Sequence, residues 1–251
     1  MRGYRDLAEE LRQRINAGEF PAGSTLPRIV DLIDQYGLAR QTVRDAIGEL
    51  VDEGLVATLG KGGTQVRHRT AVRIPLARYT RVLRPGGSRG PWETALANQG
   101  LDGRMRVVAV TRGPGPADVA AALGVDQESD LLYRQRHATI GEIDVVQLQH
   151  AWYSAALADS AGIAGDGKIK GGILAALAAA GITPASLSEQ VRARPPLPNE
   201  TTPLKIGGKV AVLEVERVTK DAQGRVLEVL RSVAPADRIQ LTYDDLPLKE
   251  A

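Results

Sequence analysis

The sequence predicts an α+β protein in two parts, a helical domain that ends in a β-hairpin and a larger domain built on an antiparallel sheet. Two observations support this prediction. Up to residue 53, apolar residues recur every three or four positions, and after it they alternate, which marks a change from helices to strands. Beyond residue 92, short segments typical of strands are separated by turns and by brief helical stretches, as expected for hairpins with interspersed helices.

Three helices are expected before residue 54. The first spans Tyr4 to Ala17, the second follows Pro27 and ends at Gly37, and the third spans about Arg40 to Glu53. Glycine directly after the last periodic residue is a common stop signal. A strand at 55–59, a turn at 60–63 and a return strand at 64–66 follow. This order is typical of a winged helix-turn-helix domain, which we assign to residues 1–70.

Residues 71–91 are expected to form a basic linker with one strand near Val72, and residues 92–251 a second domain. The expected elements of that domain are a helix at Trp92 to Gln99, a strand at Arg104 to Thr111, a helix at Asp118 to Leu123, strands at Leu131 to Ile140 and Ile143 to Tyr153, a helix at Gly172 to Ala180, and strands at Leu187 to Ala193, Ala211 to Thr219 and Val226 to Ala234.

Composition excludes several kinds of site. The 251 residues include no cysteine, so disulfides and cysteine-based metal or nucleophile sites are excluded. The three histidines, His68, His137 and His150, are scattered, and we expect no metal site and no cofactor. The longest nearly apolar stretch, 171–182, is too short to span a bilayer, and the first twenty residues have no apolar signal core. We expect a cytoplasmic protein.

Charge is unevenly distributed along the chain. The formal net charge is only +2, but residues 54–91 contain eight basic residues and no acidic one. Those residues are Lys61, Arg67, Arg69, Arg73, Arg78, Arg81, Arg84 and Arg89. Such a segment suits contact with a polyanion. A solvated linker kept soluble by arginine is the alternative.

The start of the expected third helix carries polar side chains of the kinds that can contact DNA bases. If Val43, Ile47 and Leu50 face the core, the residues that face outward at its first turns are Arg40, Gln41, Thr42 and Arg44. In a helix-turn-helix these positions enter the major groove. Arginine pairs with guanine, glutamine with adenine, and threonine with phosphate or a thymine methyl group. Taken alone, the same residues could form an ordinary solvated helix face.

The turn between the two expected strands contains Gly60, Lys61, Gly62 and Gly63. Glycines let the backbone approach a phosphate, and Lys61 could reach the minor groove. The glycines could equally be simple turn residues. The turn lacks the strand-to-helix setting of a nucleotide-binding loop.

Residues 4–66 resemble the DNA-binding domain of the GntR family of bacterial transcription regulators. The matching segments are Pro21-Ala22-Gly23 with Leu26-Pro27, Tyr36-Gly37-Leu38, Arg40-Gln41-Thr42-Val43-Arg44, Leu50 to Val56, and Gly60 to Thr64. The resemblance implies DNA readout by Arg40, Gln41, Thr42 and Arg44, with Gly60 and Lys61 at the wing. The family usually has Ser-Glu-Arg after Leu-Pro, where this chain has Arg28, Ile29 and Val30. We expect Arg28 to replace the missing backbone contact.

Residues 116–243 resemble the UTRA effector-binding domain of the HutC-type branch of that family, which has a chorismate-lyase-like fold. The matching segments include Tyr133 to His137, Val146-Gln147-Leu148 with Trp152-Tyr153, Ile169 to Gly172, and Gly224 to Glu228. The resemblance implies a domain that binds a small metabolite and dimerises.

A candidate effector site follows from strand alternation. Arg134 and Arg136 lie on one face of a strand, so two guanidinium groups there require an anion. That anion is a ligand phosphate or carboxylate, or an internal acidic residue. Glu228 could bind a ligand hydroxyl or pair with such an arginine, and Trp152 and Tyr153 could line the pocket. Gly172, where phosphosugar-responsive relatives have serine, offers a backbone N–H at the start of a helix.

We therefore expect a DNA-binding regulator, a repressor by family resemblance, that binds a two-fold-symmetric operator as a homodimer and responds to a small, possibly anionic, effector. In one alternative the C-terminal domain only dimerises and binds no effector. A lyase-like enzyme is the other, but no catalytic triad, metal cluster or acid–base pair supports it.

Overall fold

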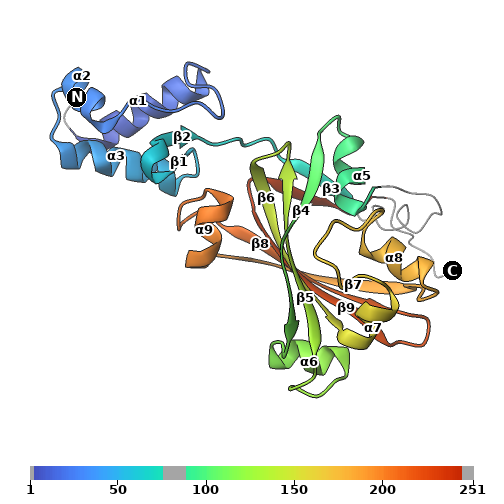
Figure 1. Ribbon diagram of the computed structural model, residues 1–251. Coiled ribbons are helices and arrows are strands. Elements are labelled where there is room, and N and C mark those ends of the chain that lie inside the picture. Colours follow the sequence, from blue (N-terminus) through green and yellow to red (C-terminus); the bar gives the residue numbers. More distant parts are fainter. Residues whose placement is uncertain (1–2, 76–88, 245–251) are drawn as a thin grey trace. The chain divides into compact units, whose positions relative to one another are not determined.

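The computed structural model describes residues 3–75 and 89–244, which divide into two compact units (Figure 1). The first unit contains residues up to Thr70 together with 194–212 and 235–238. The second unit contains the described residues of 71–193, 213–234 and 239–244. Of the expected basic linker, 71–91, residues 76–88 lie outside the described residues, and so do Arg78, Arg81 and Arg84 of the basic segment.

The first unit contains the three expected helices, α1 (Tyr4–Asn16), α2 (Ile29–Tyr36) and α3 (Arg40–Asp52). Their apolar faces meet in one core, in which Leu7, Leu32 and Leu50 have no exposed surface. Gly37 ends α2 in a left-handed conformation with φ 63°, which glycine adopts without strain.

The wing follows α3. Strands β1 (Val56–Thr58) and β2 (Thr64–Val66) are antiparallel, and the 3₁₀ turn η1 (Gly60–Gly62) joins them. Thr25 adds a single bridge to Gln65. The hairpin thus continues directly from the third helix, and the winged helix-turn-helix prediction is confirmed. The helix α9 (Pro198–Leu204) also belongs to this unit.

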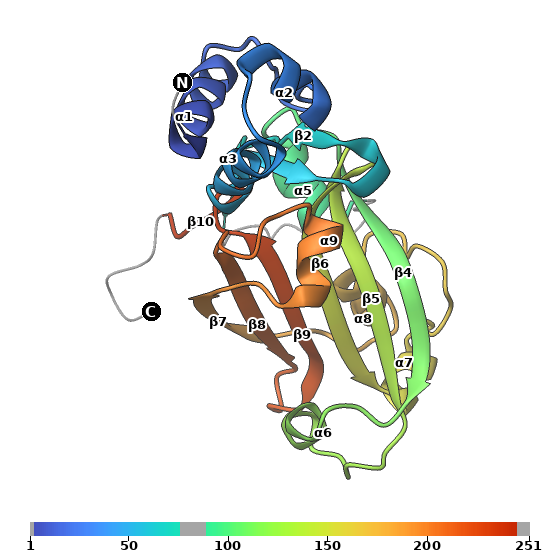
Figure 2. The same ribbon diagram turned by 90° about the vertical axis from the view of Figure 1, so that its left-hand side faces the viewer.

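The second unit is built on a six-stranded sheet with the order β4-β5-β6-β9-β8-β7 (Figure 2). The strands are β4 (Gly103–Gly113), β5 (Leu131–Ile140), β6 (Asp144–Ser154), β7 (Ser186–Arg194), β8 (Val212–Lys220) and β9 (Val226–Pro235). The β4–β5, β5–β6 and β6–β9 pairs are antiparallel, which confirms the predicted α+β class.

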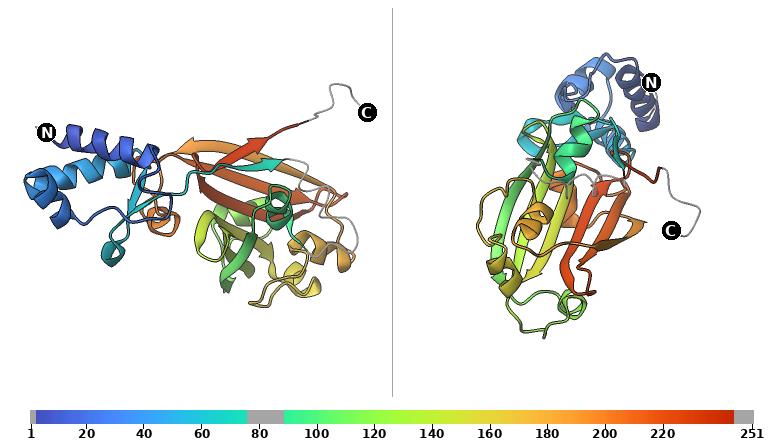
Figure 3. Two further views of the ribbon diagram at one scale, coloured as in Figure 1. Left: turned by 90° about the horizontal axis from the view of Figure 1, so that it is seen from above. Right: turned by 90° about the vertical axis from the view of Figure 1, so that its right-hand side faces the viewer.

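Helices lie on both faces of this sheet. α7 (Ala155–Ser160) and α8 (Ile173–Ala179) pack on one face against a core that includes Leu132, Tyr153 and Leu227 (Figure 3). α6 (Ala117–Leu123) packs with Leu131 and Val229. α5 (Pro91–Ala97) packs with β3 (Val72–Pro75), whose partner in a separate two-stranded parallel ladder is β10 (Ile239–Thr242).

Three elements were not expected: α7, α9 and β10. A serine N-cap starts α7, since the Leu157 N–H donates to Ser154 Oγ. Four prolines between 195 and 203 predict a loop, yet Pro198 occupies the first turn of α9, where proline is tolerated. The Leu197 N–H donates to Glu200 Oε2 at 2.7 Å and closes that turn. No helix of the described residues is long and apolar enough to cross a bilayer.

Candidate functional site

The start of α3 presents a group of exposed polar side chains. Arg40, Gln41 and Arg44 are exposed and Thr42 is half-buried, whereas Val43 and Ile47 are buried in the core. Helical periodicity causes this separation, because residues three and four apart share a face. Gln41 donates to Asp45 Oδ1 at 2.7 Å. Within the described residues, neither Arg40 nor Arg44 has a hydrogen bond or ion pair through its side chain, so both guanidinium groups are available to an external acceptor.

The end of the wing is also exposed. Gly60 has φ 55° and Gly63 φ 76°, and the Leu59 N–H donates to the Gly63 carbonyl at 2.8 Å. These left-handed conformations favour glycine, and they close the turn so tightly that Lys61 extends from its surface into solvent. Arg28 is exposed at the N-cap of α2, where its backbone N–H donates to Asp31 Oδ2.

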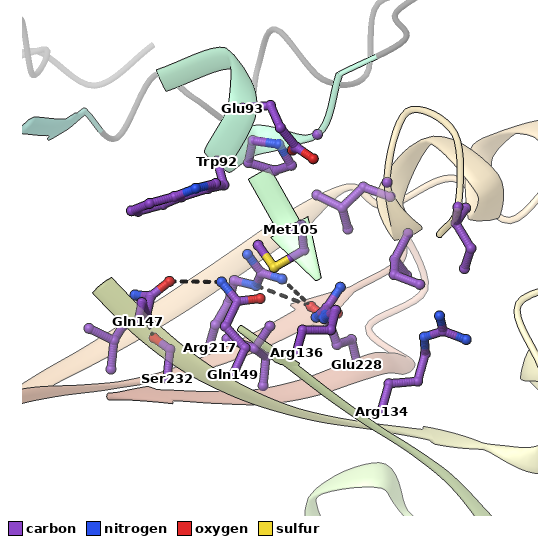
Figure 4. A pocket seen from close by; sticks show the side chains of 18 of the residues that line it. Trp92, Glu93, Met105, Arg134, Arg136, Gln147, Gln149, Arg217, Glu228 and Ser232 are labelled. Carbon is purple, nitrogen blue, oxygen red and sulfur yellow. Dashed lines mark hydrogen bonds and ion pairs between the residues drawn. The ribbon is translucent and has the colours of Figure 1, made fainter. Parts of the chain in front are cut away.

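A cavity of about 110 Å³ lies within the second unit, several times the space that one water molecule requires. All six strands of the sheet contribute to its wall, together with β3, β10 and residues around α5 and α8. Figure 4 shows Trp92, Glu93 and Met105 on one side of the cavity and Arg136, Gln149 and Glu228 on the other.

One row of side chains crosses four strands to form this wall. Val107 on β4 pairs with Arg136 on β5, Arg136 with Gln149 on β6, and Gln149 with Ser232 on β9. Directly paired residues of adjacent strands share a face of the sheet. All four side chains therefore point into the cavity.

The two arginines of β5 have different surroundings. Arg134 is 1% exposed, and its Nη atoms donate to the backbone carbonyls of Ile163, Gly165 and Gly167, at 2.7 Å for Ile163 and 2.9 Å for Gly167. Arg134 thereby holds the loop before α8. Burial lowers the pKa of Arg134, which still leaves a guanidinium protonated at neutral pH.

Arg136 is half-buried and points into the cavity. Its Nε and Nη2 atoms are buried and find no hydrogen-bond acceptor in the part of the chain that the structure describes. Buried donors without an acceptor are unusual and unfavourable. This guanidinium is the strongest structural indication of a ligand in the cavity.

Glu228 is fully buried at the floor of the cavity. Its Oε2 accepts from Arg217 Nε at 3.1 Å and Nη2 at 2.5 Å, and its Oε1 accepts from the Tyr153 hydroxyl. Burial opposes ionisation, but the charges of Arg217 and Arg136, together with the hydrogen bonds from Tyr153 and Arg217, outweigh it and lower the pKa of Glu228. Burial raises the pKa of Tyr153, so this hydroxyl stays a donor.

Gly172 lines the cavity, but Trp152 and Tyr153 do not line it. Trp152 projects from the opposite face of β6, toward the core of α6, because its neighbours Ala151 and Tyr153 belong to the core of α7 and α8. Tyr153 is fully buried and reaches the cavity only through Glu228. Gly172 precedes α8 with φ 84°, a conformation in which a serine would be strained.

Comparison with known proteins identifies both units. A model described as bacterial regulatory proteins of the gntR family matches residues 3–66, and a model of the UTRA domain matches residues 98–240. The chain belongs to the GntR family. This GntR-family chain is a bacterial transcriptional regulator with a UTRA domain and not an enzyme.

Similar proteins agree with this assignment. An HTH-type transcriptional regulator of Rhizobium meliloti is 27% identical over 247 residues, covering 96% of this chain and 94% of the relative. A crystal structure assigned to a GntR-family transcriptional regulator has a TM-score of 0.61 at 26% identity, with 98% of each chain covered. Over 64 residues, 26% of this chain and 27% of the other, the chain is 34% identical to the mannosyl-D-glycerate transport/metabolism system repressor MngR of Escherichia coli.

The predicted site residues of this GntR-family regulator fall into two groups. Those predicted to contact DNA are Arg28, Arg40, Gln41, Thr42, Arg44, Gly60 and Lys61, and all of them lie within the matched helix-turn-helix segment. Of the predicted effector residues, Arg134, Arg136, Gly172 and Glu228 line one cavity of the UTRA domain. Their roles remain predictions.

Sequence reasoning missed Gln147, Gln149, Arg217 and Ser232 at the cavity. Arg217 had a signal, because it lies four residues before the turn at 221–224 and Glu228 lies four residues after it. Hairpin symmetry brings such positions close together. No such sequence signal existed for Gln149 and Ser232, because their position beside the cavity depends on the register between β6 and β9.

Proposed function

We infer that this GntR-family regulator represses transcription by binding, as a homodimer, to a two-fold-symmetric operator, and that a small effector in the UTRA cavity changes its affinity for DNA. The supporting observation for DNA readout is the start of α3, where Arg40 and Arg44 are exposed and free of internal partners among the described residues. Such arginines are suited to the bidentate recognition of guanine.

Repression and location are inferred from similarity and chemistry. The helix-turn-helix segment is similar to that of MngR, which is named a repressor. A regulator of bacterial DNA acts in the cytoplasm, and no helix of the described residues could anchor it in a bilayer. In dimers of helix-turn-helix proteins, each recognition helix reads one half-site, with centres about one helical turn apart.

Effector response is supported by the cavity. Unpaired buried donors on Arg136 favour a ligand-binding domain over one that only dimerises. Coupling between effector and DNA is expected to amount to about 1–3 kcal/mol and to be reciprocal, so that DNA changes effector affinity by the same factor.

The experiment that tests this function is selection of bound duplexes from a random library, followed by footprinting and mass determination of the complex. We expect a palindromic consensus whose half-sites have centres about 10 base pairs apart, bound by two copies of the chain. An asymmetric consensus bound by one copy, or no enrichment above random sequence, would contradict the proposal.

Lys61→Ala is expected to weaken binding to all duplexes to a similar degree. Lys61 extends from the wing without an internal partner among the described residues, and a lysine at a phosphate contributes through counterion release. The slope of log affinity against log salt should become shallower by about 1. Titrations at several salt concentrations measure this slope, and an altered consensus with an unchanged slope would show that Lys61 reads bases instead.

A further inference from the structure

We propose that the ligand of the UTRA cavity is an organic monocarboxylate with an apolar body, bound through one edge of the Arg136 guanidinium. The inference rests on the proposed function, since it assigns the effector of that function to a chemical class. Three features of the cavity lead to it: the geometry of Arg136, the balance of charge, and the supply of hydrogen-bond donors.

The two unpartnered atoms of Arg136 are Nε and Nη2. In a planar guanidinium, the N–H groups of these two atoms lie parallel along one edge and form a fork. The two oxygens of a carboxylate match this fork with two parallel hydrogen bonds. Arg134 also has an unpartnered Nε, but both of its Nη atoms donate to the loop at 163–167, so its guanidinium is already engaged by the protein.

Among the described residues that line the cavity, one positive charge is in excess. Four of them are cationic and three are carboxylates: Arg134, Arg136, Lys168, Arg217, Glu93, Glu189 and Glu228. Arg217 pairs with Glu228 at 2.5 Å, and Lys168 pairs with Glu93 at 3.1 Å. A ligand with one negative charge neutralises the excess. A dianion would leave a net negative charge in a partly enclosed space, which is unfavourable.

The remaining polar side chains near Arg136 are partly satisfied by one another. Gln149 Nε2 donates to Gln147 Oε1 at 2.8 Å, and Gln147 Nε2 donates to Ser232 Oγ at 3.2 Å. Part of their donor capacity is therefore used within the protein and is not available to the three terminal oxygens of a phosphate ester. Across the cavity, Met105 and the ring of Trp92 present apolar surface, since Trp92 Nε1 donates to the Thr139 carbonyl. An apolar ligand body fits this side.

Calorimetric titration of the full chain tests the assignment with four probes: phenylacetate, hexanoate, the neutral phenylacetamide and the dianionic phenyl phosphate. We expect the two carboxylates to bind saturably, and the amide and the phosphate ester to bind about 10-fold or more weakly. Arg136→Lys keeps the charge but removes the fork, and Arg136→Gln removes both. Each is expected to weaken carboxylate binding about 10- to 100-fold. Arg104→Gln, at an exposed arginine of β4 that pairs with Asp102 and Glu142, should not change it.

Stronger binding of phenyl phosphate than of the carboxylates, no saturable binding of any probe, or unchanged affinity in Arg136→Lys overturns the assignment. If Arg136→Gln fails to fold, the carboxylate assignment is tested by the lysine variant and by the comparison of phenylacetate with phenylacetamide. Operator binding, measured with the same preparation, distinguishes failure of the ligand class from failure of the proposed function. Normal operator binding without carboxylate binding refutes only the ligand class, whereas loss of operator binding by the parent protein refutes the proposed function.

Discussion

Arg40→Ala and Arg44→Ala are each expected to reduce discrimination between the selected operator and unrelated duplex by about 1–3 kcal/mol. Both arginines are exposed at the start of α3, and neither contributes to the core of the first unit. Their loss should leave folding intact while it removes contacts to base edges. Competition titrations with operators changed at one base pair at a time would assign each arginine to its position.

A matched control separates base reading from general charge. Arg192 is an exposed arginine on β7 that pairs with Glu214, and Arg192→Ala removes the same charge far along the chain from α3. We expect this variant to discriminate as the parent does. If both α3 variants also bind the operator with parental discrimination, the first turns of α3 do not read the bases.

Glu228→Gln is expected to lower the free energy of unfolding at neutral pH by about 3–5 kcal/mol, the usual cost of removing one member of a buried ion pair. The substitution leaves the Arg217 guanidinium without its carboxylate inside the protein. Denaturant unfolding measures this loss. The double variant Arg217→Met, Glu228→Leu should be destabilised less than the sum of the two single variants, and strict additivity would contradict direct coupling.

Because of the Glu228 carboxylate, we expect the free energy of unfolding to depend on pH. The pKa of Glu228 in the folded state lies below its ordinary value, so the unfolded chain binds more protons in the acid range. The contribution of Glu228 is therefore complete above the ordinary glutamate pKa of about 4.3 and is lost as the pH falls through the lower folded value. Glu228→Gln should show a flatter decline of unfolding free energy over this range, and an equally steep decline would exclude Glu228 as its source.

Local patterns were sufficient for most of the elements. The β5 bounds, Leu131–Ile140, equal those expected from alternation, and α3 differs by one residue at its end. Both are long and strongly periodic, which makes the period easy to read. α9 was not predicted because its prolines resemble a loop, and about two turns of helix contain too few residues to show a clear period. β10 was not predicted because its pairing partner β3 lies more than 160 positions earlier in the sequence.

The start of α3 and the cavity also differ in how far local sequence could predict them. The residues of α3 that we predict to face DNA lie within five consecutive positions of one helix, so periodicity and resemblance together were enough to select them. The cavity collects side chains from all six strands of the sheet. Alternation placed Arg134 and Arg136 on one face, but only the register of β5, β6 and β9 brought Gln149 and Ser232 beside them. We expected Trp152 to line that wall. Side chains alternate along β6, however, and Trp152 lies on the face opposite to Gln147 and Gln149.

The pairing of β3 with β10 has a consequence for the order of events during synthesis. The ribosome produces Ile239 long after Val72, and these two residues are register partners. Helices α1 to α3 and the wing share an apolar core whose residues all precede residue 67, so this core can form on the nascent chain well before then. A message cut short before codon 239 would therefore yield a folded helix-turn-helix core followed by a second unit that lacks β10, the partner strand of β3.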